Sequence, residues 1–290
     1  MLKSLPVLAV AAVLSAACTS TSFPAPSTPE PQPSSPIPHG QIQRSDIQSW
    51  RFTFTDDVHS YSSVSRTIIQ PLSNLQQSVD TFTTTSNFSV SIDRLQTPSP
   101  ISGELSEINT VSSQRAHNQP LVTAGFSFTG TLMSGEIFLR PVSPSADTAI
   151  CGGPAASSLG ELHSALLSLP AQIQPGTHWT DTLTTSTCSG DRLPLAGKII
   201  RSYEVEDISR QTGVTIKRTE EIHLLGTGSQ LQHQIEVTAK GSGLSALLLN
   251  LETGILQTAQ ENQHLDIIIQ TSGRTYHFRQ EVTQQIKLTH

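Results

Sequence analysis

The chain has 290 residues and a formal net charge of −6, and charged residues make up only 14% of it. An acidic chain with few charges lacks the concentrated basic surface that nucleic-acid binding requires, which argues against that class of partner. Aromatic residues reach only 5%, which argues against a stacking surface for sugars or bases. A chain rich in Thr, Val and Ile but poor in Lys and Glu favours strands.

The N-terminus has the pattern of a signal peptide. Lys3 precedes an apolar run over residues 5–14 that is broken only by Pro6, and small residues then lead to Cys18. Because a bilayer span needs about 20 apolar residues, the run is too short to cross a membrane as a helix. It therefore predicts a cleaved segment that is not part of the fold. An ordinary secretory signal with Ala-x-Ala-like cleavage is the alternative.

The segment LSAAC at residues 14–18 resembles the lipobox of bacterial lipoproteins. That family usually has Leu three places before the cysteine, whereas this chain has Ser15 there and Leu14 one place earlier. The resemblance implies that the Cys18 thiol carries a diacylglyceryl group and that residues 1–17 are removed. Since two or more acyl chains attach a protein stably to a membrane, the expected location is the cell envelope, with the membrane bound through the lipid.

A proline-rich tether follows this cysteine. In lipoproteins of enteric bacteria, Asp after the lipidated cysteine retains the protein at the inner membrane, so by resemblance Thr19 favours the outer membrane. Within residues 18–48, Pro alternates with Ser, Thr, Ala, Glu and Gln, a composition that cannot bury a core and favours polyproline II. We expect a spacer here; a Pro-rich ligand for a partner module is the alternative.

Alternation with a period of two dominates from residue 49 onward. In the clearest case Tyr276, Phe278 and Val282 point one way, while charged and polar residues point the other. This pattern is typical of antiparallel strands with one buried face. Similar runs occupy residues 50–54, 82–92, 199–205, 214–224 and 231–237. Glycine-containing breaks predict turns at residues 211–213, 226–228, 241–243, 253–254 and 272–273.

One segment, residues 157–169, has a helical period. Ser157 and Ser158 offer an N-cap and Pro170 ends the segment. The leucines that share one face are Leu159, Leu162, Leu166 and Leu169. The sequence thus predicts a mainly β fold: antiparallel meander sheets, curved or sandwich-like, with one short amphipathic helix packed on them. The domain at residues 49–290 is either one continuous sheet or two sub-halves, residues 49–150 and 171–290, joined by the helix.

Three cysteines are present. If Cys18 carries lipid, Cys151 and Cys188 remain as a pair in an oxidising compartment, which predicts a disulfide across the helix. A reactive thiol or a pair of metal ligands is the alternative. No C-x-x-C spacing exists, and two cysteines alone do not make a structural zinc site.

No hydrolase or nucleotide-binding motif is present, so we expect no catalytic residue, no cofactor and no metal site. Residues 56–59, Asp-Asp-Val-His, have ligand types suited to a cation, but a solvated turn is the preferred interpretation. Glu221 and His223 share one face of a strand, opposite Glu220, and are expected to be surface charges. His233 is in phase with apolar neighbours, so it is expected to be buried or at the rim of a sheet.

The leading functional hypothesis is a non-catalytic envelope lipoprotein that binds an apolar ligand or another envelope component. A curved antiparallel sheet closed by a helix can enclose an apolar groove, and this layout loosely resembles periplasmic lipid-carrier lipoproteins, although no motif carries that likeness. The run at residues 246–251 is apolar on both faces and is equally consistent with a strand covered on both sides. The alternatives are a structural or assembly lipoprotein that acts through protein contacts, and an enzyme without a recognisable motif. The proposed groove residues are Leu244, Leu247, Leu249 and Leu251.

Overall fold

The computed structural model describes residues 47–72, 79–113, 121–142, 162, 165–189, 193–230 and 233–290. Almost all of its regular structure is strand. In chain order the strands are β1 (Trp50–Arg51), β2 (His59–Pro71), β3 (Asp80–Ile92), β4 (Ser99–Ser112), β5 (Leu121–Met133), β6 (Glu136–Val142), β7 (Gln172–Ile173), β8 (His178–Ser189), β9 (Leu193–Ser209), β10 (Gly213–Gln230), β11 (His233–Leu249), β12 (Leu256–Thr271) and β13 (Arg274–Leu288).

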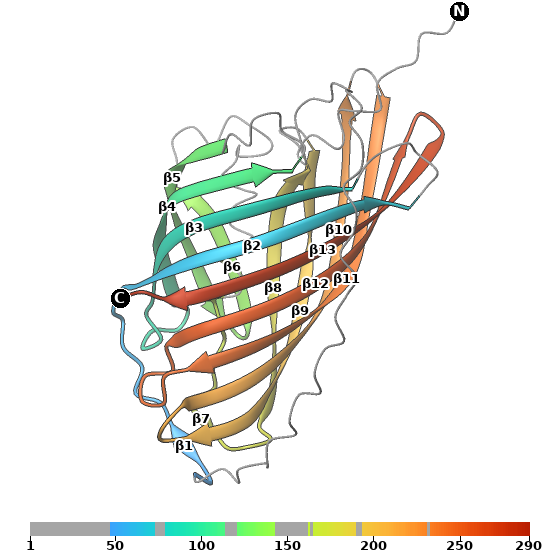
Figure 1. The fold of residues 1–290 in the computed structure, drawn as a ribbon. Coiled ribbons are helices and arrows are strands. Elements are labelled where there is room, and N and C mark those ends of the chain that lie inside the picture. Colours follow the sequence, from blue (N-terminus) through green and yellow to red (C-terminus); the bar gives the residue numbers. More distant parts are fainter. Residues whose placement is uncertain are drawn as a thin grey trace, which may run out of the picture.

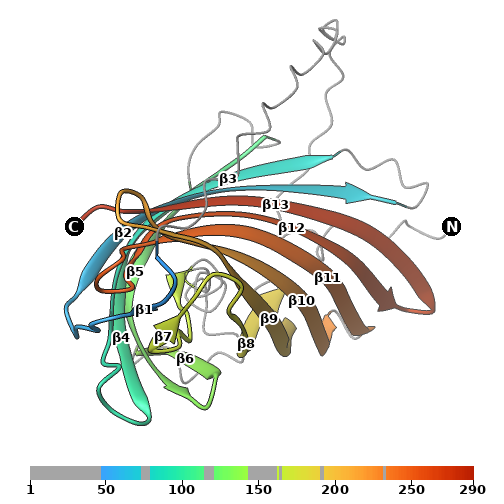
Figure 2. The ribbon, with the colours of Figure 1, turned by 90° about the horizontal axis from the view of Figure 1, so that it is seen from below.

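Eleven of these strands close into one barrel, in the order β10-β11-β12-β13-β2-β3-β4-β5-β6-β8-β9 (Figure 1). Neighbouring strands are antiparallel except β6 and β8, which run parallel over only three register pairs. Figure 2 shows β9 to β13, β2 and β3 curving together as one arch around the interior. The short strands β1 and β7 form a separate two-stranded sheet.

The predicted mainly β fold is confirmed, but the predicted curved or sandwich-like meander is wrong because the sheet closes on itself. Both predicted sub-halves contribute to this one barrel. The last strand, β13, pairs with β2 from Phe278↔Pro71 to Leu288↔Tyr61, so the two halves share a continuous ladder. Periodicity identifies the buried face of a strand but does not identify its partner, which is why closure was missed.

The helix predicted at residues 157–169 is not supported. Of the described residues in that range, Leu166 to Leu169 have no regular structure. Their backbone bonds to the barrel instead: the Leu167 carbonyl accepts from Arg94 Nη2 at 2.8 Å, and the Ser168 N–H donates to Asp181 Oδ2 at 3.1 Å. We call Leu162 and residues 165–169 the plug segment, because its leucines pack into the barrel core.

The plug segment occupies one end of the barrel, which we call the plugged end. There, a Cβ placed on Gly254, in the β11–β12 turn, would lie 3.1 Å from the Phe52 ring and 3.3 Å from Leu169. At the opposite end, β10 ends at Gln230 beside the first residue of β11, His233, and the β12–β13 turn lies there too; we call it the hairpin end (Figure 1).

The two faces of the barrel wall differ in polarity. Along β3, for example, Phe88 and Val90 face inward and are buried, whereas the alternate residues are threonine, serine and asparagine. Outward positions of β10 to β13 carry many charged and amide side chains. These include Lys217, Glu221, Lys240, Gln260, His264, Asp266, Arg279, Glu281 and Lys287. The large apolar side chains that are exposed on the outside, such as Leu225 and Val64, are scattered.

Three of the predicted turns are confirmed, and two are wrong. Gly213, Gly254 and Gly273 have positive φ and lie in the turns that precede β10, β12 and β13. The glycines at 226–228 and 241–243 instead continue β10 and β11. At position 243 a Cβ would lie 2.9 Å from Glu220 Oε2, so glycine there makes room for an inward carboxylate and does not mark a turn.

Candidate functional site

A row of polar side chains crosses the barrel interior. Register pairs place its members side by side on seven consecutive strands from β9 to β3: Tyr203, Arg218, Ser245, Glu261, Gln284, Ser65 and Thr84. We call this row the polar belt. Because it occupies inward positions near the middle of the strands, it separates the plugged-end half of the interior from the hairpin-end half.

Asp181 on β8 anchors one edge of the polar belt. Its carboxylate accepts two hydrogen bonds from Arg201, from Nε at 2.6 Å and from Nη2 at 2.9 Å. The Tyr203 hydroxyl donates to it at 3.0 Å, and the backbone N–H of Ser168 adds a fourth bond. Arg201 is 0% and Asp181 2% exposed. This buried bidentate pair therefore joins the plug segment to β8 and β9.

A second ionic cluster lies on β10 to β12, where one cation meets two carboxylates. Arg218 Nη2 donates to Glu261 Oε2 at 2.8 Å and to Ser245 Oγ at 3.0 Å, and Arg218 Nε lies 3.0 Å from Glu220 Oε1. Gln263 Nε2 donates to Glu220 Oε2 at 2.9 Å and also contacts Glu261. The three charged side chains are nearly or fully buried.

This shortage of positive charge affects the acid–base behaviour of Glu220. Burial is the main cause that raises the pKa of Glu220 from 4.5 to about 7; Arg218 lowers this pKa, and the neighbouring Glu261 raises it further. Two carboxylates that share one guanidinium in a site without water favour a state in which one of them holds a proton. The cluster can therefore hold a proton near neutral pH, but it contacts no open cleft among the described residues.

Part of the hairpin-end half of the interior, on β10 to β13, is lined by apolar side chains. One register row across β10 to β13 consists of Leu224, Ala239, Ile267 and Phe278, and the next contains Val237, Ile269 and Tyr276. We call these seven residues the apolar wall. Leu224, Ile267 and Phe278 point inward and yet remain partly exposed. Their free surface therefore faces the interior of the barrel.

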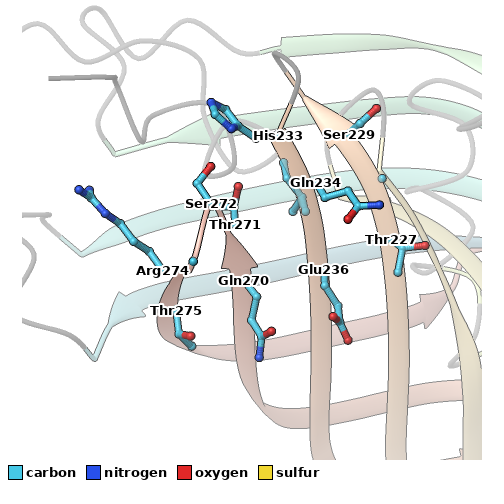
Figure 3. Close-up of a pocket in the computed structure, with 13 residues that line it drawn as sticks. Thr227, Ser229, His233, Gln234, Glu236, Gln270, Thr271, Ser272, Arg274 and Thr275 are labelled. Atoms are coloured by element: carbon cyan, nitrogen blue, oxygen red, sulfur yellow. The ribbon is translucent and has the colours of Figure 1, made fainter. Parts of the chain in front are cut away.

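A shallow depression of about 830 Å³ lies at the tips of the two hairpins (Figure 3). Its described lining is mostly polar, with Ile235 as the one large apolar residue. In Figure 3, Glu236 and Arg274 lie on separate strands and point away from each other, so no acid and base converge there. The lining residues are Thr227, Gly228, Ser229, His233, Gln234, Ile235, Glu236, Gln270, Thr271, Ser272, Gly273, Arg274 and Thr275.

The residues at 56–59 do not form a metal site with other described residues. Asp57 and His59 line a small cavity at the plugged end, while Asp56 is exposed. No group of three potential His, Cys, Asp or Glu ligands occurs within the described ranges.

The predicted surface pair is confirmed. Glu221 Oε1 lies 2.7 Å from His223 Nε2, and their side chains are 65% and 48% exposed. His233, the first residue of β11, is exposed at the rim of the barrel, so of its two predicted placements the rim is confirmed.

Three of the four leucines of the predicted groove, Leu247, Leu249 and Leu251, pack in or against the barrel core, and Leu244 does not. Leu247 and Leu249 are buried in the barrel core, Leu244 points outward and is 49% exposed, and Leu251 lies in the turn after β11. Because side chains alternate between the two faces of a strand, Leu244 on β11 points away from Leu247 and Leu249. Cys18 and Cys151 lie outside the described residues, and Cys188 falls in β8. The lipidation and the disulfide therefore stay predictions.

Sequence reasoning missed the buried charges, although a signal for them exists. Arg218 is in phase with Ile216 and Ile222, and Arg201 is in phase with Ile199 and Tyr203. A charged residue at an inward position of an alternating strand indicates a buried ionic partner. What the sequence does not contain is the register that brings these arginines to Asp181 and Glu261.

The described residues include no helix that is long and apolar enough to span a membrane. No family model and no curated protein matches the chain. Among solved structures it is similar to one described as "Asymmetric conductivity of engineered proteins", with 8% identity over 80% of this chain and 99% of that chain and a TM-score of 0.20. A mutant of Rh. blastica porin gives 8% identity over 79% of this chain and 99% of that chain, also with a TM-score of 0.20. At such TM-scores the likeness carries no argument about fold or function.

Proposed function

We propose that this chain is a lipid-anchored protein of the cell envelope whose barrel binds an apolar ligand in its hairpin-end half. The observation that carries the proposal is the apolar wall, in which Leu224, Ile267 and Phe278 face inward and remain partly exposed. Apolar surface that faces a concave interior is stabilised when a ligand removes it from water, at about 25 cal/mol per Å².

The chemistry of the apolar wall favours an aliphatic ligand. Five of its seven members are aliphatic, and the aromatic rings of Phe278 and Tyr276 lie two residues apart on one strand. Toward the plugged end, the apolar wall gives way to the polar belt. The charged groups of the belt are already engaged in ion pairs and hydrogen bonds. An acyl chain that enters from the hairpin end would therefore meet its limit at the polar belt.

The outer face of the barrel favours water as its surroundings. Strands that face lipid carry an outward apolar band and a polar lumen, and an outward Arg or Lys at the bilayer midplane costs about 2–4 kcal/mol. Here the outer positions of β10 to β13 carry Lys217, Lys240 and Arg279, and the apolar wall lies on the inner face of the same strands. We therefore propose that the membrane is reached through lipid on Cys18 and that the outer membrane is the site of anchorage.

Two adjacent isoleucines on β12 provide a test of ligand binding. Ile267 points into the barrel and Ile268 points out, and both are partly buried. We expect Ile267→Asn to weaken binding of the apolar fluorophore N-phenylnaphthylamine by about tenfold or more, because burial of one aliphatic side chain contributes about 1.5–3 kcal/mol. Fluorescence titration of the full chain measures this effect.

Ile268→Asn is the matched control, since it makes the same chemical change on the opposite face. Its affinity for the fluorophore should stay within about twofold of wild type. Equal losses in the two variants, or no saturable binding to the wild type, would contradict the proposed function.

A further inference from the structure

A small cavity at the plugged end is lined by an arginine that has no carboxylate partner among the described residues. The cavity has a volume of about 40 Å³ and lies between the plug segment, the start of β2, the end of β3 and the β11–β12 turn. Polar and charged side chains that line it are Thr55, Asp57, His59, Tyr61, Arg94 and Thr253. Its apolar lining includes Phe54, Val90, Ile92, Leu167 and Leu256.

Arg94 follows β3 and uses little of its hydrogen-bonding capacity. Its Nη2 donates to the Leu167 carbonyl at 2.8 Å, and its guanidinium carbon lies 5.2 Å from the centre of the Phe54 ring. No described carboxylate forms an ion pair with it. Burial lowers the pKa of Arg94 to about 10, so the group is still charged at neutral pH. A guanidinium has five N–H donors, and several of them are therefore available.

The nearby buried carboxylate cannot serve as the missing partner. Asp181 acts on Arg94 electrostatically, but its two oxygens already accept four hydrogen bonds, including both bonds from Arg201. Asp181 thus interacts with two guanidinium groups, Arg94 and Arg201, and forms its ion pair with Arg201. Asp57, which also lines the cavity, is exposed to solvent.

A second polar atom at this cavity lacks a partner. Thr55 Oγ1 is buried and makes no hydrogen bond within the described part of the chain. A buried hydroxyl without a partner costs about 1–3 kcal/mol. Burial also lowers the pKa of His59, which favours a neutral ring that can donate from one nitrogen.

We propose that this cavity binds a small carboxylate, whose oxygens accept hydrogen bonds from Arg94 and Thr55. A cavity of about 40 Å³ holds about three water-sized groups, which matches a carboxylate with one carbon attached. A planar guanidinium pairs with a carboxylate through two parallel hydrogen bonds, and Val90, Ile92 and Leu256 supply contacts for the attached carbon. The site lies on the other side of the polar belt from the apolar wall, so it does not depend on the proposed function.

Acetate is the probe for this site, observed through broadening of its methyl proton resonance by the full chain. Wild-type protein should broaden the resonance at millimolar acetate, and neutral acetamide of the same shape should show no broadening. Thr55→Val keeps the volume of the side chain and removes only the hydroxyl; it should weaken acetate binding by about tenfold, the usual effect of one hydrogen bond to a charged group. Arg94→Lys should abolish binding, because an ammonium cannot form the two parallel bonds.

Two variants of neighbouring residues serve as controls. Thr53→Val lies on the exposed side of the same segment and should leave acetate affinity unchanged, and Asp57→Asn should leave it unchanged or strengthen it. The proposal is overturned if acetate and acetamide behave alike, or if Thr55→Val binds acetate as tightly as Thr53→Val. It is also overturned if Asp57→Asn abolishes binding, since Asp57 would then be needed for it.

Discussion

Replacement of Arg201 by methionine is expected to lower the free energy of unfolding by about 3–5 kcal/mol. The substitution removes the cation of a pair that is 0% exposed at both side chains, with a distance of 2.6 Å between Arg201 Nε and Asp181 Oδ1. Asp181 would keep its bonds from Tyr203 and Ser168 but would be left as a buried charge without a counter-ion. Urea denaturation at pH 7, followed by circular dichroism, measures the change.

An exposed ion pair provides the matched control. Arg279 Nε lies 3.5 Å from Asp266 Oδ1 on the outside of the barrel, with side chains 50% and 69% exposed. Arg279→Met should cost less than about 1 kcal/mol, because water screens exposed pairs. The double variant Asp181→Leu/Arg201→Met should recover much of the single-variant loss, since it leaves no unpaired charge. Equal losses for Arg201→Met and Arg279→Met would contradict the buried network.

Glu220→Gln is expected to change how stability depends on pH. The pKa of Glu220 in the folded barrel is raised to about 7, above its ordinary value of 4.5. Between these two pH values the folded state binds the proton more tightly than the unfolded state does, so the wild type loses stability as pH rises from about 4.5 to about 7. The difference in pKa corresponds to about 3–3.5 kcal/mol, of which about 2–3 kcal/mol falls between pH 5 and pH 8. Glutamine resembles the protonated carboxyl and has no such dependence.

The comparison that measures this is the free energy of unfolding of wild type and Glu220→Gln at pH 5 and at pH 8. The variant should gain about 2–3 kcal/mol relative to wild type between the two values. Glu221→Gln, one residue along and 65% exposed, should gain less than about 0.5 kcal/mol over the same interval. A constant difference between wild type and Glu220→Gln would show that Glu220 is ionised throughout, and that Arg218 outweighs burial and Glu261.

Alternation in the sequence predicted several of the strands, including parts of β3, β9, β10 and β13, and which of their faces are buried. The inward row at the C-terminus, from Tyr276 through Phe278 to Ile286, is found in β13 as the pattern predicts. Closure of the barrel was not predictable in this way. It depends on the pairing of β13 with β2, two strands about two hundred residues apart in the chain. It also depends on the three parallel pairs between β6 and β8.

The plug segment shows how tertiary contacts override a local period. Leu162, Leu166 and Leu169 have helical spacing, and the first two are 1% exposed, so their burial agrees with the prediction. However, the backbone of Leu167 and Ser168 bonds to Arg94 and Asp181. A helix that ended at Leu169 would satisfy the Ser168 N–H internally but would leave the Leu167 carbonyl without a partner. Neither Arg94 nor Asp181 can be inferred as a partner from the leucine spacing.

The candidate sites depended even more on three-dimensional information. Arg218 and Arg201 are detectable from the sequence as charges at inward positions. Which residues they face is set by strand register, which places Arg218 opposite Ser245 and Ser245 opposite Glu261. Arg94 lies outside any strand, and no periodicity indicates that it is buried. Arg94 and Thr55 line the same cavity because the plug segment and the residues before β2 close the end of the barrel.

We propose that the barrel lies in water and is held to a membrane only by lipid on Cys18, and fractionation of a Cys18→Ser variant distinguishes this arrangement from a barrel embedded in lipid. After lysis without detergent, the variant is expected in the aqueous fraction, with a cooperative urea transition equal to that of the wild type in detergent. A variant that stayed in the membrane fraction after an alkaline carbonate wash would contradict the claim, because the barrel itself would then be embedded in lipid.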